Sequence, residues 1–563
     1  ANQPMYSNDK RFVIVFNGEI YNFRELKEQL KNFYNFKTTS DTEVLLAAYS
    51  KWGKDFVKKL NGIFAFVIYD KKDKSFFMAR DHNGTKPLYY YHQDNKFIFS
   101  SELKGVLEHD LPRVLNIDAF NQLLRLQYIS GNGTIIRNVS KLPPASWAYL
   151  SGNELKIEQY WQSHPGNVSK LNKKELSQQV LNKVQTAVKR QLISDRPLGI
   201  YLSGGIDSSA VLSAACKVRG KDVDTFSVGF DLKDGEEGER YNADFVLAAK
   251  TAKFFGTNHH EVYIGEKDVV NDFENMVWHC DEPIPNPTTL AMYKLAHFTK
   301  DKADVILGGD GGDELFGGYR RYQLSLAASV YQKYVPSFLR KSLVFNNKLR
   351  KLNTKRSIDR FALFFFQKDD TLPGVINKDY FDSDLTFNLF KNKYFSRENL
   401  DKFNTKEEML MWVDRQSWLV DHSLLLSDRM AMSAGLENRV PLLDRELIEF
   451  ADTIPLKYKL GLFNTKIILK QAFGSELPEF LFNQPKRGWF SPGAKWLRRP
   501  LVKKMAKQIL SKSYYQPTAT LFNWDKVDKI FDEHCDKTKY NLTIIWTLLV
   551  FQVWAKLYKV KLS

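Results

Sequence analysis

The sequence predicts a two-domain protein of mixed α/β and α+β class, because two regions differ clearly in pattern. In residues 1 to about 110, strand-like apolar runs alternate with short helical patterns. From about residue 173, long helical patterns alternate with short apolar strands. These strands are expected at residues 198–202, 225–230, 261–264 and 305–307. This βαβ rhythm predicts a parallel sheet flanked by helices, followed beyond about residue 320 by an almost entirely helical region.

The N-terminal elements each have a local signal. Strands are expected where β-branched and aromatic residues dominate, at residues 11–16, 64–69 and 97–99. A helix is expected at 41–49, because Ser40 and Asp41 stand at its N-terminal end. Residues 112–165 are interpreted as a β-rich connector. The pattern then breaks, so we place the boundary between domains of residues 1–165 and 166–563.

Composition limits the class of protein. The 563 residues are 43% hydrophobic and 26% charged, which is ordinary for a globular protein of two or three domains. The three cysteines are far apart and show no zinc-type spacing, which favours a reducing compartment. The chain opens on a polar stretch, and its most apolar late stretch, 542–554, is too short to span a bilayer and contains Gln552. We expect a cytoplasmic protein without a membrane partner, and a buried helix at 542–554.

The net charge of +17 admits nucleic acid or an anionic surface as a partner. The excess is spread along the chain, with some concentration at residues 340–360, and no stacking motif or repeat accompanies it. A solvated basic face is therefore the favoured interpretation, with no nucleic-acid partner. The oligomeric state is left open, and a homodimer is one arrangement that we keep.

The first motif is Ser203-Gly204-Gly205-Ile206-Asp207-Ser208-Ser209, between an apolar strand and a helical pattern. Adjacent glycines let the backbone approach a ligand, and the helix start offers free N–H groups and a positive dipole end to an anion. The serine hydroxyls add donors, and Asp207 can hold a divalent cation against phosphate. An N-capped helix after a tight turn is the alternative. The motif resembles the PP-loop of ATP pyrophosphatases, which release pyrophosphate while adenylating a substrate.

The second motif is Gly308-Gly309-Asp310-Gly311-Gly312-Asp313-Glu314, directly after the strand expected at 305–307. Ligands bind at the carboxyl ends of parallel strands, and glycines let the backbone line a nucleotide. Asp313 can share Mg²⁺ with Asp207. A turn shaped only by Gly and Asp chemistry is the alternative.

Taken together, these motifs and the segment from Asp428 to Asp444 resemble glutamine-dependent asparagine synthetase of the bacterial B type, over essentially the whole chain. The resemblance implies an N-terminal class II glutamine amidotransferase domain of Ntn-hydrolase-like αββα fold and a C-terminal PP-loop ATP pyrophosphatase domain. It also matches residues 225–230 to a strand beside adenine, and residues 485–489 to a late loop that carries Lys486.

In the N-terminal domain, Asn17-Gly18-Glu19-Ile20-Tyr21-Asn22 looks like the glutamine site of class II amidotransferases. There the Asn side chain and the Gly N–H stabilise the tetrahedral oxyanion. Glu19 and Asp41 match carboxylates that hold the glutamine α-amino group.

Two departures from the family pattern stand out. The family nucleophile is an N-terminal cysteine, whereas this chain starts at Ala1, and several tens of N-terminal residues are missing by comparison. We expect that the natural protein has them, because the glutamine-site residues persist together; a cysteine-free relative is the alternative. Asp310 stands where many members carry Glu, so the fine geometry of the acceptor site is open.

The resemblance implies amidation of L-aspartate to L-asparagine through β-aspartyl-AMP, with ATP and Mg²⁺. The nitrogen comes from glutamine in the complete protein, or from ammonia in this chain. ATP is expected over Leu202, Val228, Gly308, Gly309 and the first motif. Mg²⁺ is expected on Asp207 and Asp313, Lys486 adds positive charge, and Asp310 takes a proton from ammonia.

Several alternatives stay open. A β-lactam precursor or a sugar acid of a surface glycan could be the acceptor, and residues 281–289 are the candidate acceptor wall. A tRNA-modifying PP-loop enzyme and an inactive binding protein are further rivals. Arg429, Glu437 and Arg439 could equally form a structural ion-pair network.

Overall fold

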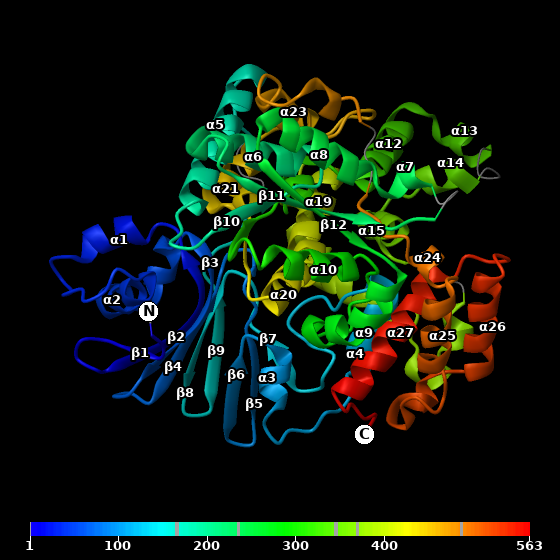
Figure 1. Cartoon of the computed structure of the whole chain (residues 1–563), viewed down its shortest axis with the longest axis horizontal. Helices are drawn as coiled ribbons and strands as arrows, with labels where there is room; N and C mark the ends of the chain where they lie inside the picture. Colours follow the sequence, from blue (N-terminus) through cyan, green and yellow to red (C-terminus); the bar gives the residue numbers. More distant parts are fainter. Residues whose placement is uncertain (1, 164–167, 234–236, 343–346, 368–370, 485–487) are drawn as a thin grey trace.

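The computed structural model describes residues 2–563 except 164–167, 234–236, 343–346, 368–370 and 485–487. Figure 1 shows an N-terminal body of strands, coloured blue, beside a larger body of helices around a second sheet. The domain boundary expected at residues 165 and 166 falls outside the described residues.

The N-terminal domain is built on two antiparallel sheets. The larger has the order β1-β2-β3-β4-β8-β9 and the smaller has the order β6-β5-β7. The larger sheet consists of β1 (Met5–Tyr6), β2 (Phe12–Ile20), β3 (Gly62–Asp70), β4 (Ser75–Arg80), β8 (Ser146–Ser151) and β9 (Glu154–Gln159). The smaller consists of β5 (Tyr89–Gln93), β6 (Lys96–Ser100) and β7 (Val139–Lys141). The strands expected at residues 11–16, 64–69 and 97–99 are confirmed as parts of β2, β3 and β6.

The two sheets pack face to face, and helices cover the outer face of each. Val67, Met78, Leu88 and Leu142 fill the space between the sheets. Helices α1 (Phe23–Leu30) and α2 (Asp41–Trp52) cover the larger sheet through a second core. Tyr89 of the smaller sheet shares a core with α3 (Leu103–Leu107) and α4 (Ile117–Leu126). The αββα layering implied by the resemblance is therefore confirmed.

The connector prediction was wrong in one respect. Residues 112–165 contain α4, a helix of 10 residues whose N-cap Asn116 accepts a hydrogen bond from Ala119 N. Leu123 and Leu124 on this helix are buried in the core that joins the two domains. Strand patterns on both sides of the helix concealed its 3.6-residue periodicity.

The C-terminal domain contains a parallel sheet of order β12-β11-β10-β13-β14. Its strands are β10 (Leu198–Tyr201), β11 (Asp224–Phe230), β12 (Asn258–Ile264), β13 (Val305–Leu307) and β14 (Glu437–Arg439). The first four are the predicted strands. The fifth, β14, is a short strand within the region after residue 320 that was expected to be almost entirely helical. Its three polar and charged residues give no strand signal, and pairing with β13 determines its conformation.

Helices cover both faces of this sheet (Figure 1). One core lies beneath α5 (Lys173–Gln191), α6 (Ile206–Arg219), α8 (Ala243–Phe255), α21 (Arg445–Thr453) and α23 (Ile467–Ala472). The other lies beneath α9 (Glu266–Cys280), α10 (Thr289–Thr299), α20 (Leu425–Ser433), α25 (Pro500–Ile509), α26 (Trp524–Cys535) and α27 (Leu542–Leu557). The buried helix expected at 542–554 is confirmed in α27. Among the described residues, none of the helices combines the length and the apolar character that a membrane span requires.

The remaining helices are mostly short and lie toward the C-terminal half. They are α7 (Gly238–Tyr241), α11 (Gly312–Phe316), α12 (Arg320–Tyr334), α13 (Ser337–Ser342), α14 (Asn347–Leu352), α15 (Ser357–Phe365), α16 (Leu372–Val375), α17 (Leu385–Tyr394), α18 (Arg397–Leu400), α19 (Lys406–Gln416), α22 (Leu456–Lys459) and α24 (Gly493–Trp496). A π-helical turn, Leu419–Leu424, leads into α20.

Buried ion pairs and backbone hydrogen bonds join the two domains. Lys86 Nζ lies 2.7 Å from Asp428 Oδ1, with both side chains buried. Lys141 Nζ lies 3.1 Å from Asp421 Oδ1, and Arg429 donates to the Ser101 carbonyl at 2.5 Å. Near the end of the chain, the Leu115 N–H donates to the Lys561 carbonyl at 2.8 Å. The interface thus fixes the domains through specific polar contacts as well as a shared core.

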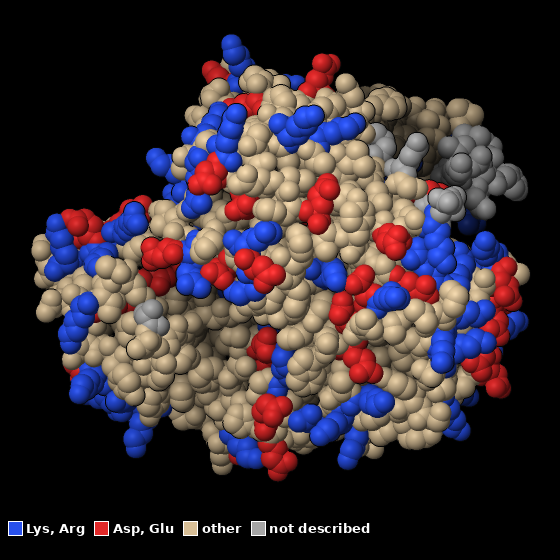
Figure 2. Space-filling view, in the orientation of Figure 1, with Lys and Arg blue, Asp and Glu red and all other residues tan. Residues whose placement is uncertain are grey.

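Surface charge is mixed. On the face shown in Figure 2, Lys and Arg lie among Asp and Glu over most of the molecule. The solvated basic face that the charge pattern indicated stays a prediction.

Candidate functional site

A cavity of about 850 Å³ opens at the carboxyl end of the parallel sheet. It is lined by residues from both glycine motifs, from β11, from α20 and from the segment before α10. The predicted site residues that line it are Leu202, Ser203, Gly204, Gly205, Asp207, Ser208, Val228, Gly308, Gly309, Asp310 and Asp313. Pro285, Asn286, Pro287 and Thr288 of the predicted acceptor wall also line it. Two loops that are a hundred residues apart in sequence therefore face one space.

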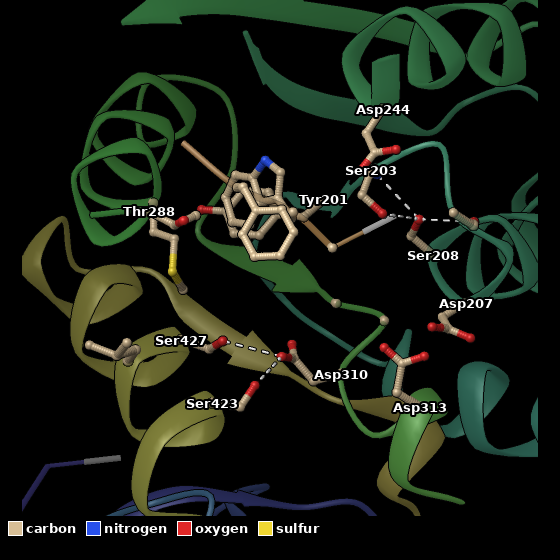
Figure 3. A pocket seen from close by; sticks show the side chains of 18 of the residues that line it. Tyr201, Ser203, Asp207, Ser208, Asp244, Thr288, Asp310, Asp313, Ser423 and Ser427 are labelled. Atoms are coloured by element: carbon tan, nitrogen blue, oxygen red, sulfur yellow. Dashed lines mark hydrogen bonds between the residues drawn. The ribbon is translucent and has the colours of Figure 1, made fainter. Parts of the chain in front are cut away.

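The first motif has the shape of an anion cradle. Gly204 adopts a φ of +65°, and a Cβ there would lie 2.6 Å from the Asp244 carbonyl, so only glycine fits. Gly205 is the N-cap of α6 and has no side chain to cap the helix. The first N–H groups of α6 therefore stay available to a ligand in the cavity. Ser203 Oγ and Ser208 Oγ lie 3.0 Å apart beside them (Figure 3). The arrangement suits an anion with several oxygens, such as a polyphosphate.

The second motif packs against the first. A Cβ on Gly309 would lie 2.8 Å from Ser208 N, so the absence of a side chain lets the two loops touch. Asp207 and Asp313 consequently approach each other, as Figure 3 shows. One ammonium group joins them: Lys466 Nζ contacts Asp207 and lies 2.5 Å from Asp313 Oδ1. Burial opposes the charge on Lys466, but the two carboxylates outweigh burial and hold its pKa above the ordinary value.

Lys466 is a site residue that sequence reasoning missed. It directly precedes α23, and neither adjacent glycines nor a carboxylate cluster marks this segment as a ligand loop. It adopts a φ of 53°, a left-handed conformation that a non-glycine residue holds only where surrounding structure imposes it. Lys486, the lysine chosen from the sequence, lies outside the described residues.

Asp310 is held by two serines of the helical segment that faces it. Ser423 Oγ and Ser427 Oγ each donate to Asp310 Oδ1 at 3.3 Å (Figure 3). Burial raises the pKa of Asp310, and the two serine hydroxyls oppose that shift. Asp310 lines the cavity, where a ligand can reach it. Its raised pKa means an increased affinity for a proton. Serines at i and i+4 in a helical pattern were the signal that could have identified this pair.

Beyond Asp310, the cavity wall contains a buried acid and a fixed arginine. Tyr319 donates to Glu314 Oε1 at 2.7 Å, and burial together with the charge of Asp313 raises the pKa of Glu314 to about 7. Arg321 donates through Nε and Nη2 to Asp414 Oδ2, at 3.0 and 2.7 Å. This end of the cavity can recognise a polar ligand of either charge.

Ser209 is the predicted nucleotide residue that the structure does not bring to the cavity. It lies fully buried within α6, and it is absent from the cavity lining. The helical turn directs its side chain away from the face that carries Ser208.

The predicted glutamine site is a second cluster, at the end of β2. Gly18 has a φ of +144°, and any side chain there would collide with the Ile63 carbonyl of β3. Asn17 Nδ2 donates to Ser101 Oγ at 3.2 Å. The Ile20 N–H donates to Asp41 Oδ2 at 3.0 Å, which places the first residue of α2 beside the strand.

Glu19 completes this cluster and contacts the other domain. Its Oε2 lies 3.5 Å from Arg439 Nη2, on β14 of the parallel sheet. Burial and the neighbouring charge of Asp41 raise the pKa of Glu19 to about 8, while Arg439 opposes the shift. Burial also raises the pKa of Asp41. Two neighbouring carboxyl groups whose negative charge is poorly compensated suit a ligand that carries an ammonium group.

Comparison with known proteins agrees with this architecture. A family model described as asparagine synthase matches residues 179–556, and one described as a glutamine amidotransferase domain matches residues 1–161. Asparagine synthetase [glutamine-hydrolyzing] 1 of Bacillus subtilis is 30% identical, over 98% of this chain and 86% of that protein. A putative asparagine synthetase [glutamine-hydrolyzing] of Mycobacterium tuberculosis is 27% identical, over 97% and 84%. Amidase chyE of Penicillium rubens is 26% identical, over 91% and 81%.

The fold and the two sites define a two-domain amidotransferase that uses ATP. An amidotransferase domain and a synthetase domain follow one another along the chain, as the two matched models do. This chain belongs to the asparagine synthase family, whose enzymes carry out ATP-dependent amidation.

Proposed function

We propose that this chain amidates L-aspartate to L-asparagine through a β-aspartyl-AMP intermediate, releasing AMP and pyrophosphate. The observation that carries the proposal is the convergence of Asp207, Asp313 and Lys466 beside an anion cradle, with Asp310 in the same cavity. Such a cavity accommodates a nucleoside triphosphate at one end and a small carboxylate at the other.

In this proposal ATP lies with adenine against Leu202 and Val228 and with its phosphates over the first motif. Gly308 and Gly309 line the nucleotide on the opposite side. A carboxylate oxygen of aspartate attacks the α-phosphorus, the bond to the β-phosphate oxygen breaks, and pyrophosphate leaves. The protein contributes position and charge, since Lys466 and the N-terminus of α6 face the departing oxygens.

Ammonia then attacks the acyl carbon of the adenylate, and AMP leaves. Asp310 is placed to take the proton that the attacking nitrogen loses, because burial raises its proton affinity. Asn17, Gly18, Glu19 and Asp41 would hold glutamine as the nitrogen donor in the N-terminal domain, and free ammonia is the alternative donor.

The site fits Mg²⁺ as a partner of ATP. Asp207 and Asp313 present oxygens to one cationic centre, and Mg²⁺ is usually held by one or two carboxylates together with substrate phosphates. Phosphate oxygens of ATP would complete the coordination. When bound, the ion would supply positive charge to the phosphate oxygens.

We also propose a cytoplasmic location, which the three free cysteines support. A homodimer stays a prediction that sedimentation of the purified chain would check.

The proposed function is tested by pyrophosphate release with MgATP and ammonium, with and without L-aspartate, and by mass spectrometry of the product. Aspartate-dependent pyrophosphate together with asparagine is the expected result. If aspartate gives no stimulation while the folded protein still binds ATP, the acceptor is another carboxylate, and sugar acids would be assayed next.

Asp310→Asn should lower the ammonium-dependent rate by about 10²- to 10⁴-fold, because the amide cannot accept the proton. Asp304→Asn is the matched control: Asp304 lies outside the cavity lining, where it pairs with Lys300. Equal rates in the two variants would remove Asp310 from the mechanism.

A further inference from the structure

Arg439 touches both sites at once. Its main-chain carbonyl accepts a hydrogen bond of 2.9 Å from the N–H of Gly308, the first residue of the second motif. Its side chain extends into the other domain, where Nη2 lies 3.5 Å from Glu19 Oε2. A single residue therefore connects the predicted glutamine site with the loop that carries Gly309 and Asp310.

Most contacts of the guanidinium are short and internal to the C-terminal domain. Nη1 donates to the Gln191 and Ile193 carbonyls at 2.7 and 2.6 Å, and Nε donates to Glu437 Oε1 at 2.5 Å. The Arg439 side chain is only 3% exposed, whereas Glu19 is 27% exposed. Among these partners, Glu19 has the longest contact and can be reached by a ligand from solvent.

The charge balance around Glu19 depends on its occupant. Asp41 repels Glu19, and Arg439 is the cation that opposes this repulsion. The α-ammonium group of bound glutamine would be a second cation beside Glu19 and would offset part of the repulsion from Asp41. Such charge interactions are strong here because water screens them poorly in this region. The attraction between Glu19 and Arg439 would then change, and with it the restraint on β14.

The effect would reach the nucleotide loop through one hydrogen bond. β14 pairs in parallel with β13, with Arg439 opposite Leu307, and Gly308 follows directly. Gly308 lies close to the acid, since a Cβ built on it would be 2.8 Å from Asp310 Oδ2. A displacement of Arg439 would therefore move the backbone beside Asp310.

We propose that Arg439 is a positioning residue that couples occupancy of the glutamine site to nucleotide binding. The proposal rests on the function proposed for Glu19 and Asp41, and it extends that function to regulation between the two sites. By linkage, each ligand must change the affinity of the other by the same factor.

The test is equilibrium binding to the full chain, with L-glutamine and Mg·α,β-methylene-ATP as probes in a calorimeter. In the wild type, saturating glutamine should change the Kd of the nucleotide at least five-fold, and nucleotide should change the Kd of glutamine equally. In Arg439→Met, the ratio of the nucleotide Kd values with and without glutamine should fall to between about one and two. Arg445→Met is the matched control, because Arg445 also bridges the domains, through the Lys58 carbonyl, yet touches neither site.

A wild-type factor of one, or the same factor in Arg439→Met as in the wild type, would overturn the proposal. If Arg439→Met does not fold, hydrogen exchange on the wild type replaces it. Glutamine should then change the exchange rates of the amides from Gly308 to Asp310, and unchanged rates would equally overturn the proposal. Binding is measured without an acceptor, so failure of aspartate-dependent pyrophosphate release would be distinguishable from failure of the coupling.

Discussion

Replacing Lys466 by methionine would leave two carboxylates without the ammonium group that joins them. The side chain of Lys466 is 6% exposed, and those of Asp207 and Asp313 are each 18% exposed. Removing one partner of a buried ion pair typically costs about 3–5 kcal/mol. Because both carboxylates reach some solvent, we expect the lower end, about 3 kcal/mol in the free energy of unfolding.

The assay is urea unfolding monitored by tryptophan fluorescence, with Lys300→Met as the control. Lys300 pairs with Asp304 at the surface, with 42% of the lysine side chain exposed, so that substitution should cost less than about 1 kcal/mol. The pKa of Lys466 is raised, so its contribution is fully present below the ordinary lysine value of about 10.4 and is lost only above it. The difference between wild type and Lys466→Met should therefore be constant between about pH 6 and pH 9.

Magnesium provides the decisive result. In Lys466→Met, Asp207 and Asp313 no longer face the Lys466 ammonium group, so a divalent cation can take its place, and Mg²⁺ at ten times its dissociation constant should restore about 1.4 kcal/mol. The wild type, with the ammonium group in place, should gain much less. Equal stability of wild type and Lys466→Met would refute the ion-pair argument, whereas no stabilisation of Lys466→Met by Mg²⁺ would refute the sharing of one cation by the two carboxylates.

Two further predictions concern the same cavity. Gly204→Ala should destabilise the protein by about 1–3 kcal/mol and weaken ATP binding, because the residue has a positive φ and the new Cβ meets the Asp244 carbonyl. Gly205→Ala is the control and should be tolerated, because its Cβ makes an ordinary contact of 3.4 Å. Calorimetric Kd values for ATP would compare the two variants. Glu314 has its pKa raised from 4.5 to about 7, so the folded state holds this proton to higher pH than the unfolded state and stability falls as the pH rises between those values. Glu314→Gln should remove about 2–3 kcal/mol of this fall in the free energy of unfolding. Urea unfolding of both proteins at pH 4.5 and pH 8 would measure the fall in each.

Much of the synthetase site could be predicted because glycine loops and apolar strands leave strong local signals. The turn after β10 and the loop after β13 were predicted from residue types alone, and the structure brings them together in one cavity. β14 and Lys466 could not be predicted in the same way. Pairing with β13 imposes the strand on polar residues, and tertiary contacts impose a left-handed conformation on the lysine.

Ser209 and α4 illustrate the opposite error, in which a local pattern was extended too far. Ser209 belongs to the motif by sequence, but helical geometry turns it into the core. The α4 helix was hidden among strand patterns, although its Asn116 cap was a readable start signal.

The contact between Lys561 and the connector has a consequence for biosynthesis. The Lys561 N–H donates to the Arg113 carbonyl, and the Leu115 N–H donates back to the Lys561 carbonyl. Helix α27 shares a core with α4 of the N-terminal domain. Translation must therefore reach residue 561 before the connector can finish packing, even though residues 1–110 emerge from the ribosome first. A ribosome that stalls within α27 would leave an N-terminal domain with an uncovered apolar face, a target for chaperones.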